Sequence, residues 1–209
     1  MALSIWVTTF LVYVVFRLWY DGLRKPLTAE EMEGYTRLLE EHAGAGAGDE
    51  VDLAVMRKFL EEDDGKEFIM INLLQYNPSP MKHPDTGQDA RAESILLEYF
   101  RPFMGQVIRR AGHPVIAGRA VGGYLDAWNT PPDPGWHGAG LIRYRSRRDI
   151  IELSLATGKF QDLHKYKLAA LKQTIAFPTQ TQMGLYASPR VTVAMALALV
   201  AALLQLVLT

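Results

Sequence analysis

The stretch that decides the fold is Lys66–Tyr76, which reads KEFIMINLLQY. It is short and apolar, and turn-forming residues bound it, Gly65 before it and Asn77 after it. A strand that is covered on both faces reads as a continuous apolar run, so this stretch predicts a buried central strand. In a regular strand alternate residues share one face, here Phe68, Met70, Asn72, Leu74 and Tyr76.

The segment that follows predicts a loop and then a long helix. Residues 77–88 (NPSPMKHPDTGQ) contain three prolines and predict a loop. From Arg91 to Ala111 apolar pairs recur every four residues, which is typical of an amphipathic helix. We expect Pro102 to kink or divide this helix and Gly112 to end it.

Two further strands are predicted downstream. Residues 115–128 hold two strand-like stretches, and the pair Gly122-Gly123 between them indicates a bulge or an edge strand. The proline-rich turn 129–135 follows, and residues 136–145 then alternate as a strand does. Trp128 and Trp136 flank the turn and indicate either a lid or an anchor near a membrane surface.

The last part of this region predicts a helix in two segments and a final strand. Ser146 is placed to cap a helix that breaks near Gly158 and resumes over residues 160–173. Residues 174–183 predict the last strand. Pro178 lies inside that strand and cannot donate a hydrogen bond, which assigns the strand to an edge of its sheet.

The predicted order is strand, helix, strand, strand, helix, strand. This is the split βαβ order of ferredoxin-like folds, so we expect an α+β domain with a ferredoxin-like βαββαβ antiparallel sheet over residues 66–183 and helices on one face. In that topology the first and third strands are central. Pro178 and the glycine pair then fall on edge strands, in agreement with their local chemistry.

A helical region is predicted ahead of this domain, over residues 28–62. Thr28 is followed three residues later by Glu31, the pattern of a capping box, so a helix is expected from about 29 to 42. The tract Gly44–Gly48 predicts a flexible joint before a second short helix. The acidic run Glu61–Asp64 is interpreted as a solvated boundary.

The two ends of the chain are apolar. Residues 2–20 (ALSIWVTTFLVYVVFRLWY) contain one charge, Arg17, and residues 191–208 (VTVAMALALVAALLQLVL) contain none. Each is long enough to cross a bilayer as a helix, so we expect terminal transmembrane helices. A cleaved signal peptide is the alternative for the first one, but no basic residue precedes Trp6 and the segment does not end in small residues.

The cations beside the spans predict the orientation. Arg17, Arg24 and Lys25 lie on the central side of the first span, and Arg190 lies on the central side of the second. The positive-inside rule therefore places the central domain in the cytoplasm and both termini on the opposite side of the membrane.

Composition excludes several classes of function. The net charge of −1 gives no basic face for nucleic acid. The absence of cysteine excludes disulfides, thiolate nucleophiles and iron–sulfur sites. The histidines form no ligand pair, and there is no P-loop, dinucleotide fingerprint or nucleophile elbow. We therefore predict no cofactor and no metal.

Three stretches resemble a known family: MINLLQY (70–76), LIRYRSRR (141–148) and HKYKLAAL (164–171). Residues 66–183 are similar to the dimeric α/β-barrel superfamily, ferredoxin-like domains whose sheets pair in dimers, and most of all to a bacterial family known only as a domain of unknown function. The resemblance implies a homodimer and a bacterial protein, which together with the predicted spans gives a bacterial inner membrane as the expected location. The usual members are small soluble proteins, so the two spans and the helical region are additions, and Arg145 stands where a proline is expected.

The catalytic candidate is His164, near Tyr166 and Lys167, where the superfamily's cavity between sheet and helices tends to open. It is able to act as a base or a ligand, and the alternative is a surface or packed histidine. Asn72 is a polar residue in an apolar strand, so it either completes a hydrogen-bond network or faces a ligand, and Tyr76 would join it. Three further ligand-binding candidates lie on predicted strands: Arg119, Arg143 and Tyr144. An arginine facing a cavity would favour an anionic ligand.

Two functions remain open, and whether the chain is an enzyme is undecided. The first is a membrane-anchored domain that binds or transforms an apolar small molecule without a metal. The second is a non-catalytic accessory or scaffold subunit of a membrane complex, whose spans contact other membrane proteins. The expected partners are the lipid bilayer, a second copy of the chain and such membrane proteins.

Overall fold

A computed structural model describes residues 2–44, 52–155, 161–184 and 187–208. It divides into two compact units, Met1–Arg24 with Thr181–Thr209, and Lys25–Gln180. The fold is α+β, as the sequence predicts. Apart from Gly44, the expected glycine joint lies outside the described residues, and so does the expected helix break near Gly158.

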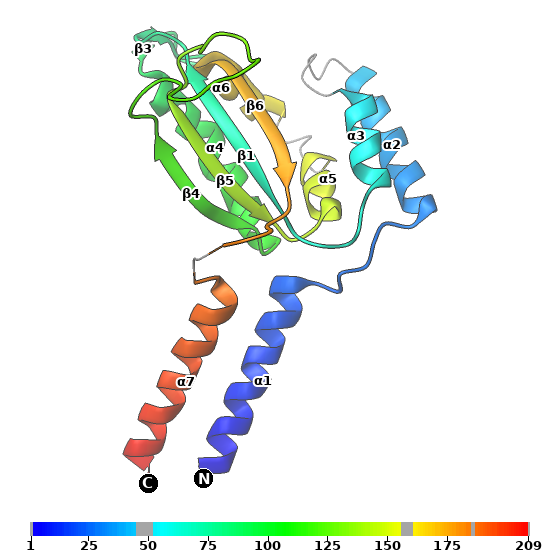
Figure 1. Cartoon of the computed structure of the whole chain (residues 1–209), viewed down its shortest axis with the longest axis vertical. Helices are drawn as coiled ribbons and strands as arrows, with labels where there is room; N and C mark the ends of the chain where they lie inside the picture. Colours follow the sequence, from blue (N-terminus) through cyan, green and yellow to red (C-terminus); the bar gives the residue numbers. More distant parts are fainter. Residues whose placement is uncertain (1, 45–51, 156–160, 185–186, 209) are drawn as a thin grey trace. The chain divides into compact units, whose positions relative to one another are not determined.

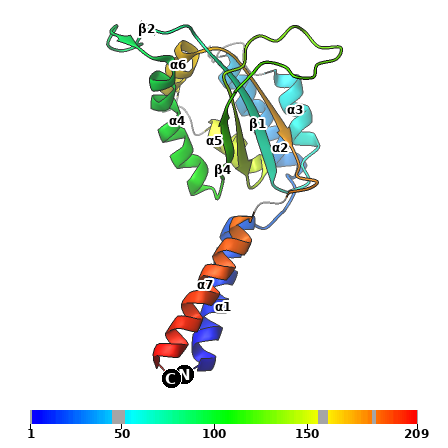
Figure 2. The same cartoon turned by 60° about the vertical axis from the view of Figure 1, so that its left-hand side comes forward.

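The first unit is a pair of helices, α1 (Ala2–Asp21) and α7 (Pro189–Leu208), which run antiparallel side by side (Figures 1 and 2). Both are long and apolar enough to cross a membrane by length and composition. Polar contacts join them: the indole nitrogen of Trp6 donates to Gln205 over 2.8 Å, and the Tyr13 hydroxyl donates to the carbonyl of Arg190 over 3.1 Å.

The second unit is built on a four-stranded antiparallel sheet in the order β4-β5-β1-β6. The strands are β1 (Phe68–Tyr76), β4 (His113–Arg119), β5 (Gly138–Tyr144) and β6 (Leu171–Thr179). The apolar stretch FIMINLL therefore lies in a central strand, as predicted. Pro178 lies on edge strand β6, which confirms the assignment made from its missing N–H group.

Three helices of this unit pack with the sheet: α4 (Ala92–Arg109), α5 (Arg147–Leu155) and α6 (Gln161–Ala170) (Figure 1). The core forms where α4 and α5 meet strands β1 and β5. Its buried residues are Phe68, Met104, Val107, Ile142, Tyr144 and Leu153. The register places Phe68 opposite Tyr144 and Met70 opposite Ile142, so alternate residues of β1 and β5 supply this face.

A helical layer precedes the sheet in the chain, formed by α2 (Ala29–Gly44) and α3 (Leu53–Glu61). The predicted capping box is present, because Thr28 Oγ1 accepts from the Glu31 N–H over 3.2 Å and Glu31 accepts from the Thr28 N–H over 2.9 Å. A second core joins this layer to α5 through Leu60 and Ile151.

The acidic run is solvated only in its first half, because Glu61 and Glu62 are exposed and the carboxylate of Asp63 is buried. The side chain of Asp63 is 3% exposed, accepts from the Leu27 N–H over 2.8 Å and lies 3.7 Å from the Arg147 guanidinium. Asp64 accepts from the Gln180 side chain over 2.9 Å. The burial of Asp63 is compensated by its hydrogen bonds and by the charge of Arg147. Asp63 and Asp64 therefore connect the end of the helical layer to α5 and to Gln180, the residue after β6.

Some predicted boundaries were wrong. Pro102 does not divide the helix, since α4 continues through it with Pro102 on the exposed face. The loop at 77–88 carries a short hairpin, β2 (Met81–Lys82) with β3 (Asp89–Ala90). Strand β6 begins at Leu171, because Asn77 bonds the last carbonyls of α6 through its backbone and side-chain nitrogens over 2.9 and 2.8 Å.

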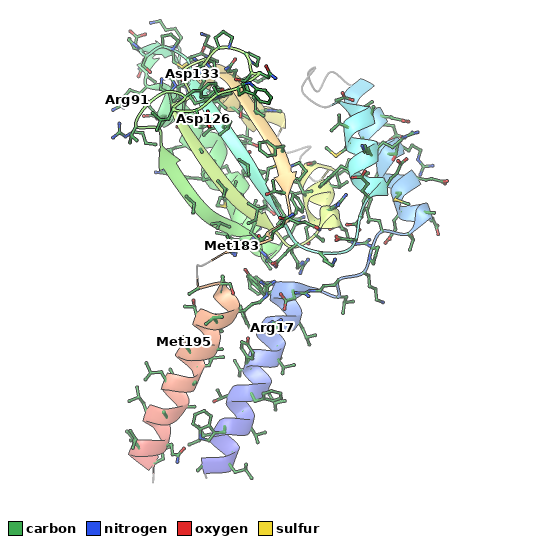
Figure 3. All side chains as sticks on the ribbon, in the orientation of Figure 1. Arg17, Arg91, Asp126, Asp133, Met183 and Met195 are labelled. Atoms are coloured by element: carbon green, nitrogen blue, oxygen red, sulfur yellow. The ribbon has the colours of Figure 1, made fainter. Side chains whose placement is uncertain are left out.

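The pair Gly122-Gly123 does not lie on an edge strand, since β4 ends at Arg119. The pair opens the loop between β4 and β5, which also contains Asp133 (Figure 3). Asp133 accepts hydrogen bonds from the backbone nitrogens of Tyr124 and Gly135, each over 2.8 Å. A Cβ atom at Gly123 would lie 2.5 Å from the Asp133 carboxylate. The glycine therefore serves this close approach and not a bulge.

Candidate functional site

An apolar cavity of about 150 Å³ lies between the sheet and helices α4 and α6. The sheet supplies its floor from all four strands, and α4 supplies aromatic side chains. The residues that line it are Asn72, Leu74, Leu96, Tyr99, Phe100, Phe103, Pro114, Ile116, Ala117, Gly140, Leu141, Ile142, Tyr144, Lys167, Leu171, Thr174 and Ala176. A cavity of this size and lining accommodates a benzene-sized ring.

Asn72 faces this cavity and also belongs to a structural network. Its side-chain nitrogen donates to the carbonyls of Met70 and Gly140, each over 3.2 Å. Carbonyls only accept, so these two contacts fix which end of the amide carries the nitrogen. The amide oxygen has no hydrogen bond within the described part of the chain, and it is a suitable acceptor for a ligand hydroxyl.

Tyr144 is the second predicted residue in the cavity wall. It is 4% exposed, and its ring stacks on Phe68 with the centroids 5.3 Å apart. Burial, and to a lesser degree the neighbouring Tyr99, raises the pKa of its hydroxyl. The hydroxyl therefore stays protonated at neutral pH and serves as a hydrogen-bond donor rather than as a base.

Sequence reasoning missed three polar residues of the wall, Tyr99, Lys167 and Thr174. The hydroxyl of Thr174 donates to the carbonyl of Leu73 over 2.8 Å. Lys167 lies three residues after His164 on α6, so helical spacing alone places the two on related faces. Tyr99 belongs to the apolar pattern of α4, which indicates a core position as readily as a cavity wall.

His164 does not line the cavity. Its ring stacks on that of Tyr99, with the centroids 6.2 Å apart and the planes at 23°, and its Nε2 atom is buried. Since Tyr99 does line the cavity, the imidazole lies behind the wall. An acid–base role for His164 toward a ligand in the cavity would have to pass through the Tyr99 ring or require movement of α6.

Tyr76 lies at the end of β1, outside the cavity lining. Its backbone N–H donates to Nδ1 of His137 over 3.2 Å, and the two rings are 5.5 Å apart. Burial, and then the nearby charge of Glu93, raises the pKa of its hydroxyl. Tyr76 therefore stabilises the end of the sheet where the β4–β5 loop returns.

The two strand arginines are not brought to the cavity. Arg143 is 2% exposed, and its guanidinium donates to Glu67 over 2.6 and 3.0 Å and to the carbonyl of Ala111 over 2.6 Å. These contacts satisfy a buried charge and make Arg143 a structural residue. Arg119 is exposed at the end of β4, opposite Gly138.

The arrangement supports binding more directly than chemistry. The wall offers an amide oxygen, hydroxyls and one ammonium group around an apolar space, and the residues that line it include no carboxylate and no imidazole. Within the described ranges, no group of three or more His, Asp or Glu side chains is placed to hold a metal ion. A small ring with one polar substituent matches this lining.

The likeness to known proteins is confined to fold. No family model matches the chain, and no curated protein matches it. A crystal structure of a protein of unknown function from Rhodopseudomonas palustris is similar, with 18% identity and a TM-score of 0.52 over 65% of this chain and 97% of that one. A methylated form of the same protein gives 19% identity and a TM-score of 0.53, over 65% of this chain and 96% of that one. About a third of this chain has no counterpart there.

Proposed function

We propose that this chain is a membrane-anchored domain that binds a small apolar molecule, a single ring with one hydroxyl or carboxylate, in the cavity beneath α4. The observation that carries the proposal is the lining itself: aromatic and aliphatic side chains surround a space of about 150 Å³, with Asn72 and Lys167 among its few polar members. Few polar groups in an apolar pocket are typical of a binding site that orients one substituent.

The domain is proposed to belong to the ferredoxin-like folds, and within them to the dimeric α/β barrels. The sheet order β4-β5-β1-β6 supports this assignment, since the first and third principal strands are central and the second and fourth are at the edges. The fold likeness to the Rhodopseudomonas palustris protein is compatible with it. A shared fold does not imply a shared activity, so no activity is inferred from this likeness.

A homodimer is proposed through the open face of the sheet. The register places Ile71 and Leu73 of β1 on the face opposite to the core, beside Phe177 and Ile175 of β6. Ile175 and Phe177 are 50% and 44% exposed. Apolar side chains gathered on one sheet face are typical of an interaction surface, and a twofold axis would pair this face with its own copy.

Helices α1 and α7 are proposed to anchor the protein as a membrane hairpin, with the central unit in the cytoplasm of a bacterial cell. Their length and composition support the spans, and the flanking Arg24, Lys25 and Arg190 support the orientation. An anchored domain would meet a lipid-soluble ligand at a high local concentration.

The binding proposal is tested with 4-fluorophenol as the probe, added to the full chain in lipid nanodiscs and followed by ¹⁹F NMR. We expect saturable binding by the native chain. Ala176→Leu adds side-chain volume to the cavity wall and is expected to weaken binding at least about tenfold, because the larger side chain takes up space that the ring would fill. Ala54→Leu, at an exposed position on α3, is the matched control.

The result decides between cavity binding and partition into lipid. Equal binding by the native chain, by Ala176→Leu and by Ala54→Leu would contradict the proposal, because the probe would then sit in the bilayer or on the surface. Asn72→Leu tests the orienting role of the amide: it is expected to weaken binding of 4-fluorophenol while sparing fluorobenzene, which lacks the hydroxyl.

A non-catalytic scaffold role is the second candidate, and the loop between β4 and β5 favours it. Asp133 and the Tyr124–Trp136 hydrogen bond of 3.0 Å order this loop, yet three of its apolar side chains point outward. Val121, Leu125 and Trp128 are 93%, 101% and 83% exposed. An ordered loop that presents apolar side chains to solvent is suited to contact with another protein.

Site-specific photocrosslinking from the loop tests the scaffold role. A benzophenone side chain at position 125 is expected to capture a defined membrane subunit in cells, and the same group at exposed Val55 on α3 is the control. Capture from both positions, or from neither, would contradict a dedicated docking loop.

A further inference from the structure

A cluster of charged side chains lies where α1 ends and α7 begins. Asp21 is 9% exposed, and its carboxylate accepts from Arg17 over 2.5 Å and from Arg190 over 2.7 and 2.6 Å. A third guanidinium, that of Arg24, lies 3.5 Å from the same carboxylate. Arginines that are separated by more than 160 positions in the chain are thereby gathered at one end of the helix pair. Figure 3 labels Arg17 at this end of α1.

The cluster carries more positive charge than Asp21 compensates. Three guanidinium groups face one carboxylate, which leaves a net formal charge of +2. The dipoles do not alter this balance, because the negative end of α1 and the positive end of α7 meet here and offset each other. The side chains of Arg17 and Arg24 are 39% and 52% exposed, so guanidinium groups remain accessible to an anion.

The aromatic side chains around the cluster indicate its depth. The Arg190 guanidinium lies 4.9 Å from the centre of the Tyr20 ring, and Arg17 lies 6.0 Å from that of Tyr13. Trp19, which directly precedes Tyr20, is 46% exposed. Tyrosine and tryptophan gather at the headgroup level of a bilayer, where their polar atoms contact the interface. If α1 and α7 cross a bilayer as proposed, the cluster and these rings lie at the level of the lipid phosphates.

We propose that Arg17, Arg24 and Arg190 bind the phosphate of an anionic phospholipid, whose acyl chains lie along α1 and α7. Arginine binds phosphate through paired N–H donors, and Asp21 holds Arg17 and Arg190 at fixed positions for this contact. Basic groups between membrane helices on the cytoplasmic side are suited to such headgroups. The inference rests on the proposed membrane hairpin and is independent of the cavity.

The test is native mass spectrometry of the full chain in mild detergent, titrated with phosphatidylglycerol or with phosphatidylcholine of the same acyl chains. We expect the first phosphatidylglycerol to bind on the order of tenfold more tightly, since a basic residue near the surface contributes about 1 kcal/mol. The double variant R17Q/R24Q is expected to reduce this preference to within about twofold. R57Q/R91Q removes two exposed arginines elsewhere and is expected to keep the preference.

The single variant R24Q controls for disruption of the helix pair in the double variant. Arg24 lies outside α1, and its contact with Asp21 is 3.5 Å long, so its loss is expected to leave α1 and α7 in place. It is expected to lower the preference by several fold. Equal affinity for the two lipids, or an equal loss in R57Q/R91Q, would overturn the proposal. Full competition by inorganic phosphate at the same concentration would also overturn it, in favour of a soluble anion. Release of the chain from membranes by alkaline carbonate would refute the anchor itself, whatever the lipid preference.

Discussion

The imidazole of His164 on α6 stacks on the phenol ring of Tyr99 on α4, with 6.2 Å between the ring centroids. Tyr99 lines the cavity and His164 does not, so the histidine supports the wall from behind. Any effect of His164 on a bound ligand therefore passes through the position of the Tyr99 ring. Variants of His164 therefore distinguish a supporting role of the residue from a catalytic one.

His164→Ala is expected to weaken binding of 4-fluorophenol by about two- to tenfold, because an aromatic pair contributes roughly 0.5–1.5 kcal/mol. His164→Phe keeps a ring behind Tyr99 and is expected to retain most of the affinity. The dissociation constants come from ¹⁹F NMR titration in nanodiscs. If the phenylalanine variant lost as much affinity as the alanine variant, the imidazole itself would have to contact the ligand.

Arg143 is expected to matter for stability and not for binding. Arg143→Met leaves Glu67 and the carbonyl of Ala111 without their buried donor, which should lower the free energy of unfolding by about 3 kcal/mol. The measurement is urea unfolding of the chain in detergent, followed by circular dichroism. Arg119→Met, at an exposed position, is the control and should change the free energy by less than about 0.5 kcal/mol. Similar values for both variants would contradict the structural role of Arg143.

The sequence predicted the features that depend on local chemistry. The missing N–H of Pro178 assigned β6 to an edge, the spacing of Thr28 and Glu31 predicted the helix start, and the run at 68–74 predicted a central strand. Each of these follows from a residue and its immediate neighbours, so no knowledge of packing was needed.

The cavity could be predicted only in part, because it depends on how α4 and α6 rotate against the sheet. Asn72 and Tyr144 line it since their strands fix the direction of each side chain. Lys167 lines the cavity, whereas His164 packs behind Tyr99 in its wall. Helical spacing alone does not predict which of the two residues faces the cavity. The sequence presents Arg143 and Asp63 as available charges, yet the side chains of both are buried against partners that are distant in the sequence.

Acid is expected to weaken the contact between the helical layer and α5. The Arg148 guanidinium and the Thr28 backbone N–H lower the pKa of Glu31 from 4.5 to about 2. A lowered native pKa stabilises the fold above the unfolded value, and this contribution is lost as the pH falls from about 4.5 to about 2. The urea midpoint between pH 6 and pH 2 should therefore fall less steeply in Glu31→Gln than in the native chain. Glu33→Gln, exposed on the same helix, should retain the native slope.

A charge on the open face of the sheet is expected to separate the proposed dimer. Phe177→Glu places a carboxylate among Ile71 and Ile175, and a twofold axis would bring two such charges together. Like charges at an interface cost several kcal/mol, so the dimer dissociation constant should rise more than about a hundredfold. Sedimentation velocity in detergent measures it. Leu168→Glu, an exposed apolar position on α6, should remain dimeric, and a monomeric native chain would refute the dimer.

The orientation of the hairpin is tested by cysteine labelling, for which the absence of native cysteine gives a clean background. Leu208→Cys lies at the end of α7, and Ser154→Cys lies at an exposed position on α5. If Arg17, Arg24, Lys25 and Arg190 hold the central unit in the cytoplasm, a membrane-impermeant maleimide should label Leu208→Cys in intact cells and Ser154→Cys only after lysis. The reverse pattern would invert the topology. Labelling of both positions in intact cells would show that the two helices do not separate the compartments. Reversal of the pattern by moving cations to the outer ends of both helices would identify these four residues as the cause.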